Sequence, residues 1–383
     1  MSLRTRQLWR WIRIAAILGV VWLVLDAARH QDALVSLDAT GSAWHEHDHD
    51  THVHDDAHDH TVTTTTTTPA SHAANLCRPH GWKPFVPPSP GRPRKVYDLL
   101  MVNTELDHLE IRLNTTFAEV DFYILVEARK TFTSLDKPLY LHPNLPRFAA
   151  YASKIIYHEI QYPPGFRPKT PWDMEDHQRN AMLTQVFPTL TGAQAPQMGD
   201  VLVVSDVDEI PRPETLRLLR ACAFPRRLTL ASRFYYYSFQ WLHRGPEWPH
   251  PQATYYQGPG GRTLRPNDLR IADGGWWPFR EWEKGVLKNA SWHCSSCFET
   301  VGELLGKMAS FSHTSMNAER FRAVERIVER VRAGRDLWDR EGEVYDRVEG
   351  NGDVPGFLVE NRERFGYMLD RDGPNAGFAD VDG

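Results

Sequence analysis

The sequence predicts an α/β protein whose mainly parallel sheet is flanked by helices. Short apolar stretches of strand length alternate with longer stretches that have helical periodicity. The stretch VLVV at 201–204 is apolar throughout, which is typical of a central strand buried on both faces. With 383 residues, of which 41% are hydrophobic, the chain is long enough to bury a large core. We therefore expect a single globular domain of this class.

The elements of this domain follow one another from residue 96. Apolar stretches predict strands at 96–102, 121–127, 153–160 and 201–205, and a long strand or hairpin arm at 227–241. Helical periodicity predicts helices at 105–117, 173–187, 213–222 and 317–334. Pro213 suits the first position of the third helix, and Gly334 suits the stop of the fourth. Strands that alternate with helices in this way indicate a sheet covered on both faces.

Three acids follow the predicted strand at 201–205 within four positions. Asp206, Asp208 and Glu209 lie at the carboxyl end of this strand, where sheets of this class bind their ligands. Carboxylates this close repel one another unless a positive charge lies between them. A hard divalent cation, Mn²⁺ or Mg²⁺, with open positions for the phosphates of a nucleotide would satisfy them. The alternative is that Asp208 or Glu209 caps the following helix.

The first 93 residues differ in composition from the rest. Arginines precede an apolar run at 14–25, which predicts an uncleaved membrane anchor with residues 1–13 in the cytosol. A cleaved signal peptide is the alternative. Residues 26–93 are rich in His, Asp, Thr and Pro, and we expect a disordered stem. The globular domain then occupies 94–371, with a tail at 372–383.

Two compositional features bear on partners. The net charge of −5 gives no reason to expect nucleic acid as a partner. Seven histidines lie between His45 and His60, and imidazole binds transition metals readily. A catalytic metal site needs ligands held in place by neighbouring groups, which a disordered tract does not supply. We expect weak metal buffering there at most.

Several separate blocks resemble one known family. They are, in chain order, the stretch 103–141, EDHQRNAM, VVSDVDEIPRPETL, SWHCSSCFE, GKMASFSHTSMN and VPGFLVENRERFGYMLD. Together they cover about 96–370, and they resemble glycosyltransferase family 17, which includes the enzyme that adds the bisecting GlcNAc to N-glycans. The resemblance implies a GT-A-like (Rossmann-like) fold, Mn²⁺ or Mg²⁺ as cofactor and UDP-GlcNAc as donor. It also implies inverting transfer to a β-mannose of an N-glycan core, in a single-pass type II Golgi membrane protein with a luminal catalytic domain.

The resemblance assigns roles to individual residues. Asp206 and Asp208 would contact the cation and the ribose, with Asp208 the direct metal ligand, Glu209 second, and His313 a later ligand or a structural histidine. Glu299 and Glu303 are candidates for the catalytic base, and Glu281 and Asp273 remain possible. Glu105 and Glu127 would line the donor pocket or cap helices. Arg112 would lie near phosphate or form a surface pair.

The four cysteines fit an oxidising compartment. Cys294 and Cys297 form a CxxC pair. A zinc site would need two more good ligands, and a redox site would need a thioredoxin-like context that the sequence lacks. We expect structural disulfides, with three possible pairings if all four are bridged. Cys77 bonded to a distant partner would fasten the stem to the domain.

Two rival functions remain. A glycosyltransferase of this fold and donor class could act on another glycan, a lipid or a wall polymer. A membrane-tethered protein could instead bind metal or glycan without catalysis, using the histidine tract or the tryptophans. The acidic triplet argues against the second.

Overall fold

The computed structural model describes residues 69–381, except 261, 273–278 and 311–313. The predicted anchor at 14–25 and most of the predicted stem lie outside the described residues. Among the described helices, none has the length and apolar character needed to cross a bilayer.

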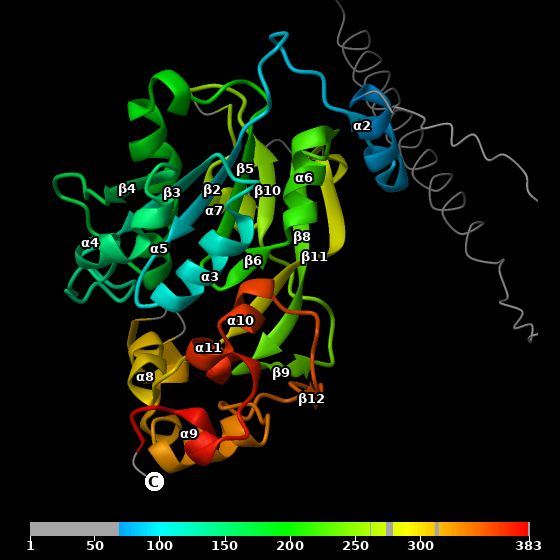
Figure 1. The fold of residues 1–383 in the computed structure, drawn as a ribbon. Helices are drawn as coiled ribbons and strands as arrows, with labels where there is room; N and C mark the ends of the chain where they lie inside the picture. Colours follow the sequence, from blue (N-terminus) through cyan, green and yellow to red (C-terminus); the bar gives the residue numbers. More distant parts are fainter. Residues whose placement is uncertain (1–68, 261, 273–278, 311–313, 382–383) are drawn as a thin grey trace, which may run out of the picture. The chain divides into compact units, whose positions relative to one another are not determined.

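One large mixed sheet organises the domain (Figure 1). Its strands follow the order β12-β9-β8-β10-β5-β2-β3-β4, with β11 and β6 paired off this path. The strands of the domain are β1 (Lys83–Pro84), β2 (Val96–Met101), β3 (Phe122–Glu127), β4 (Ile155–Glu159), β5 (Val201–Asp206), β6 (Glu209–Pro211), β7 (Cys222–Ala223), β8 (Arg227–Tyr236), β9 (Ser238–His243), β10 (Gln252–Tyr255), β11 (Lys284–Ser295) and β12 (Tyr345–Arg347).

Helices connect these strands and cover the sheet. The α-helices are α2 (Pro69–Cys77), α3 (Leu106–Thr116), α4 (Leu141–Asn144), α5 (Pro171–Ala181), α6 (Pro213–Ala221), α7 (Pro266–Arg270), α8 (Val301–Ser310), α9 (Val324–Arg332), α10 (Gly356–Glu360) and α11 (Arg362–Leu369). A capping box between Thr170 and Asp173, with Pro171 in the first turn, starts α5. Gly334, at φ +60°, ends α9 as predicted, and a β-carbon there would collide with the ring of Trp241.

The prediction of a mainly parallel sheet is correct in part. Strands β5, β2, β3 and β4 run parallel, and β11 pairs parallel with β8, whereas β10 lies antiparallel between β5 and β8, and β8 and β9 form a hairpin. Of the two alternatives predicted for 227–241, a long strand or a hairpin arm, the structure shows the hairpin.

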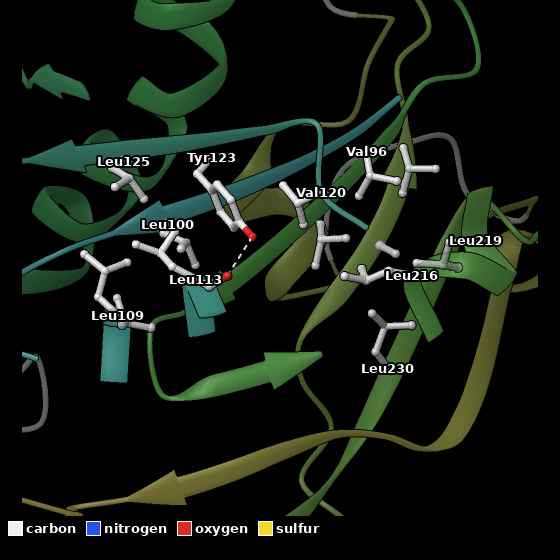
Figure 2. Packing of buried hydrophobic residues seen from close by; sticks show 14 of the residues in the cluster. Val96, Leu100, Leu109, Leu113, Val120, Tyr123, Leu125, Leu216, Leu219 and Leu230 are labelled. Carbon is white, nitrogen blue, oxygen red and sulfur yellow. Dashed lines mark hydrogen bonds between the residues drawn. The ribbon is translucent and has the colours of Figure 1, made fainter. Parts of the chain in front are cut away.

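Alternate residues of the parallel strands enter two separate cores. Leu100, Tyr123 and Leu125 pack with Leu109 and Leu113 of α3 on one face (Figure 2). Leu99, Ile124 and Val204 belong to the core on the other face, which includes Ala181 of α5 and Leu269 of α7. Both faces of β5 are thus covered, as its continuous apolar sequence predicts.

The ordered domain is larger at both ends than the predicted 94–371. Residues 69–93 were expected to be disordered, yet they include α2 and strand β1, which pairs with β7. A disulfide joins Cys77 to Cys222, so the expected attachment of Cys77 to a distant partner is confirmed. The second disulfide joins Cys294 to Cys297. Near the C-terminus, Phe378 is buried and Asp380 accepts hydrogen bonds from the first N–H groups of α8.

Candidate active site

A cavity of about 730 Å³ lies at the carboxyl ends of β2, β3 and β5. Its charged half is formed by the ends of these strands with α5, α7 and Lys307 of α8. Its aromatic half is formed by β8, β9, the loop after β9 and the segment 338–343. The charged half contains Glu105, Lys137, Glu175, Arg179, Asp206, Asp208, Glu209, Arg270 and Lys307, and the aromatic half contains Phe234, Tyr236, His243, Trp248, Trp338, Arg340 and Glu343.

Asp206 ends β5 and faces the charged half. Arg179 Nη1 donates to its Oδ1 at 2.9 Å, and Arg270 Nη2 donates to its Oδ2 at 2.6 Å. Its side chain is nevertheless 41% exposed. Two cations from α5 and α7 therefore hold this carboxylate while one side of it stays open to the cavity.

Asp208 lies deeper, with its side chain 8% exposed. Lys307 Nζ donates to Asp208 Oδ2 at 2.9 Å, and His293 Nε2 lies 3.7 Å from the same oxygen. Burial alone would raise the pKa of Asp208, but Lys307 and His293 outweigh it and hold the pKa well below its usual value. Asp208 in turn raises the pKa of Lys307, although burial opposes this. Asp208 is thus a buried carboxylate that stays ionised.

Glu209 has a structural role. Its Oε1 accepts from Trp248 Nε1 and from Arg270 Nη2, each at 2.8 Å. Its Oε2 accepts from the Asp206 N–H at 3.0 Å and from Arg270 Nη1 at 2.8 Å. These four hydrogen bonds use the acceptor capacity of a carboxylate. The prediction that Glu209 is a metal ligand conflicts with this geometry, and neither Glu209 nor Asp208 caps α6.

Arg112 braces the acidic turn from within the protein. It is fully buried and forms two 2.7 Å hydrogen bonds to Asp98 on β2. Its Nη1 donates to the backbone oxygens of Asp206 and Glu209, at 3.2 and 2.5 Å. The predicted contact with phosphate and the alternative surface pair are both wrong, because this guanidinium is enclosed by its own partners.

Of the two glutamates predicted for the donor pocket, one lines the cavity and the other does not. Glu105 lines the cavity at the start of α3, and its side chain forms no capping hydrogen bond. Burial raises its pKa. Glu127 is not among the described residues that line the cavity. Its carboxylate accepts from the N–H groups of Tyr140, Leu141 and His142, so it caps the start of α4 instead.

The residues predicted as the catalytic base also lie away from the cavity. Glu303 forms a capping box with Thr300 at the start of α8, and exposed Glu299 is not a cavity residue in the described structure. Glu281 pairs with Lys284 at the surface. Both base candidates are therefore corrected by the structure, because the carboxylates point to helix ends or solvent. His313 and Asp273 lie outside the described residues.

The acidic turn offers part of a donor set for a divalent cation. Within the described ranges, His, Cys, Asp and Glu nowhere form a group of three that could hold a metal ion. Asp206 and Asp208 still offer the oxygen donors that Mn²⁺ or Mg²⁺ prefers, and such ions often take only one or two carboxylates plus phosphate oxygens. The donor set therefore fits an ion that binds together with a nucleotide. Lys307 competes with it for Asp208.

Sequence reasoning missed the cations of the site. Arg179, Arg270 and Lys307 come from α5, α7 and α8, up to 128 residues apart in the chain (307 − 179). Arg179 and Lys307 each fall within a block that carries the family resemblance, EDHQRNAM and GKMASFSHTSMN. That position was the one signal available, since arginine and lysine are common on helices.

Comparisons with known proteins show the family of the chain. The sequence model of glycosyltransferase family 17 matches residues 53–283 and 278–373. The β-1,4-mannosyl-glycoprotein 4-β-N-acetylglucosaminyltransferases of Homo sapiens and Rattus norvegicus are 26% and 25% identical over 309 residues. These alignments cover 73% of this chain and 55% of each relative, so the chain spans about half the length of these relatives.

One solved structure is similar to a smaller part of the chain. It is the mannosyltransferase PcManGT from Pyrobaculum calidifontis in complex with GDP-Man and Mn²⁺, at 17% identity. The match covers 42% of each chain with a TM-score of 0.23, which is too low to support an argument. The family match, in contrast, spans most of the domain, and the chain belongs to glycosyltransferase family 17.

Proposed function

We propose that this glycosyltransferase moves GlcNAc from UDP-GlcNAc to a β-mannose of an N-glycan core, with inversion, on a GT-A-like fold. The names of the relatives support the sugar and the acceptor. The position of the cavity beyond the carboxyl ends of parallel strands supports the binding of a nucleotide sugar.

The charged half suits a diphosphate. Arg179, Arg270 and Lys307 each direct a cationic group to the acidic turn. Lys137 Nζ is buried at the cavity without a hydrogen-bond partner in the described structure, and lies 5.2 Å from the ring centre of Tyr140. A buried ammonium group without a partner favours an anionic ligand, because it is otherwise poorly compensated.

Asp206 and Asp208 would hold Mn²⁺ or Mg²⁺. Such an ion, when bound, stabilises the charge that develops on a departing diphosphate. Asp208 suits the direct contact because it stays ionised when buried. Asp206, more exposed and held by Arg179 and Arg270, suits a contact with ion or ribose at the cavity mouth. Arg179 and Arg270 hold Asp206 in place, and Lys307 holds Asp208.

We also propose a luminal, membrane-anchored location. The arginine-flanked apolar run at 14–25 supports an anchor of the type II orientation, with a stem before the domain. Two disulfides support an oxidising compartment such as the Golgi lumen.

The juxtaposition of Asp206 and Asp208 with three cations in one cavity carries the proposal. The test is a donor screen of the purified chain with several UDP- and GDP-sugars, with and without Mn²⁺, on a panel of N-glycan acceptors. We expect Mn²⁺-stimulated transfer from UDP-GlcNAc to a β-mannose. Transfer from UDP-GlcNAc to a different glycan, lipid or wall acceptor would favour the rival function, and no transfer with any donor would contradict the proposal.

A further inference from the structure

The aromatic half of the cavity contains a carboxylate that is held on one oxygen only. Glu343 precedes β12, whose Tyr345 pairs with His243 of β9. Tyr345 donates its hydroxyl to Glu343 Oε2 at 3.1 Å, and His243 Nε2 lies 3.3 Å from the same oxygen. Arg340 Nη2 lies 3.8 Å from it as well. Within the described structure, the hydrogen bond and the closest ion-pair contacts of this carboxylate fall on Oε2, and Oε1 accepts no hydrogen bond.

The position of Glu343 is fixed by the backbone. The bridge between Arg335 and Val344 and the hydrogen bond from Arg244 N–H to Val344 O, at 2.9 Å, hold the segment on both sides. Tyr345 is buried and stacks on Tyr236 with ring centres 4.7 Å apart. Glu343 itself is 28% exposed and lines the cavity. The structure thus presents one free carboxylate oxygen from a rigid support.

The other carboxylates of the cavity are less suited to accept a proton. Asp206, Asp208 and Glu209 each lie 2.8–2.9 Å from an arginine or lysine nitrogen, whereas Nη2 of Arg340 lies 3.8 Å from Glu343. Glu175 is paired with Arg179, and Glu105 lies in the charged half beside them. Outside the charged half, Glu247 is the other glutamate that lines the described cavity, and its Oε1 accepts from the Asn289 N–H at 3.0 Å.

Inverting transfer sets where a base must lie. The acceptor oxygen attacks the donor sugar opposite the departing diphosphate, so the base belongs on the far side of the sugar from the charged half. Glu343 comes from the aromatic half, so the proposal places the donor sugar between Glu343 and the charged half. Trp338 there offers a ring, to which the apolar face of a sugar can bind.

We propose that Glu343 is the catalytic base of this glycosyltransferase, an inference that rests on the proposed function. Oε1 takes the proton of the acceptor hydroxyl while the acceptor oxygen forms its bond to the anomeric carbon. The bond from that carbon to the diphosphate oxygen breaks, and its electron pair leaves with UDP. Tyr345 and His243 hold Oε2 and keep Oε1 directed at the acceptor.

The test compares Glu343→Gln, Glu343→Asp, Glu247→Gln and Glu341→Gln in the full chain. Glu341 lies two residues from Glu343 but is exposed and away from the cavity, so it is the matched control. Steady-state kinetics give kcat, and fluorescence titration with UDP and Mn²⁺ gives donor-site affinity. We expect Glu343→Gln to lower kcat about 10²- to 10⁴-fold, typical of a lost general base, with UDP affinity within twofold.

The remaining variants decide between explanations. Glu343→Asp should retain intermediate activity, and Glu247→Gln and Glu341→Gln should stay near the wild type. Unchanged kcat in Glu343→Gln, an equal loss of UDP affinity, or a large loss of kcat in Glu247→Gln instead would overturn the assignment. Absence of transfer by the wild type would overturn the proposed function itself, and that result is distinct from the others.

Discussion

The two halves of the cavity are built from different interactions. In the charged half, carboxylates and cations from distant segments neutralise one another, as Asp208 and Lys307 do at 2.9 Å. In the aromatic half, rings pack against rings, as Phe234 does on His293 with centres 4.9 Å apart. Trp248 joins the two halves, because its indole N–H binds Glu209 while its ring lies 5.4 Å from that of Phe234. Under the proposed function, the charged half would bind the diphosphate and the aromatic half would hold a sugar.

The largest effect on activity is expected when Asp208 of the charged half is neutralised. We expect Asp208→Asn to lower kcat about 10³-fold or more, because a diphosphate would leave without the cation contact that this carboxylate supplies. The change also leaves buried Lys307 without its partner, so thermal stability should fall. Kinetics and thermal melts of the single variant measure both effects.

A double variant separates the two effects. Asp208→Asn combined with Lys307→Met should recover thermal stability because the unpaired charge is gone, yet activity should stay lost. Recovery of activity in the double variant would show that the acid merely compensates the lysine.

The charged half depends on a buried ion pair beneath it. Arg112→Ala removes the partner of Asp98, whose side chain is 1% exposed, and releases the backbone of the acidic turn. We expect the free energy of unfolding to fall by about 3–5 kcal/mol, as for other buried charges left alone. Chemical denaturation checks this, with the exposed Arg217→Ala, whose partner is Glu119, as the control. A loss below about 1 kcal/mol would contradict the bracing role.

A buried histidine behind the acidic turn makes stability depend on pH. Burial lowers the pKa of His108 from its ordinary value of 6.5 to about 4. Between pH 6.5 and pH 4 this histidine is therefore protonated in the unfolded chain and neutral in the folded chain. The free energy of unfolding is thus highest above pH 6.5 and falls as the pH falls toward 4. We expect a loss of about 2 kcal/mol between pH 7 and pH 5 from this residue. Denaturation of His108→Gln at both pH values should show a shallower slope, and an unchanged slope would contradict this.

The smallest expected effect tests the aromatic half alone. Trp338 lines the cavity, and its indole N–H binds Met316 O at 2.8 Å. We expect Trp338→Leu to raise the KM for the acceptor about tenfold, since a lost aromatic contact typically costs more than 1 kcal/mol, while UDP affinity stays the same. Equal weakening of donor and acceptor would show that the two halves do not act separately.

Local features could be predicted from the sequence, but contacts between residues far apart in the chain could not. The apolar run before Asp206 and the acids after it predict a buried strand with a ligand site at its end, and both lie at the cavity. The partners of those acids could not be predicted, because Arg270 and Lys307 reach them through tertiary folding. Glu127 and Arg112 have residue types that suit a donor pocket, yet their own partners enclose them. Glu343 lies outside every sequence block that carries the family resemblance.

The central claim is that Asp206 and Asp208, with their cations, bind the diphosphate of the donor. The most direct measurement is a crystal structure of the chain with Mn²⁺ and UDP-GlcNAc. We predict the ion on Asp208, the diphosphate among Arg179, Arg270 and Lys307, and the GlcNAc ring between the charged and aromatic halves. A nucleotide sugar bound elsewhere, with both aspartates still paired to their own arginines and lysine, would contradict the account.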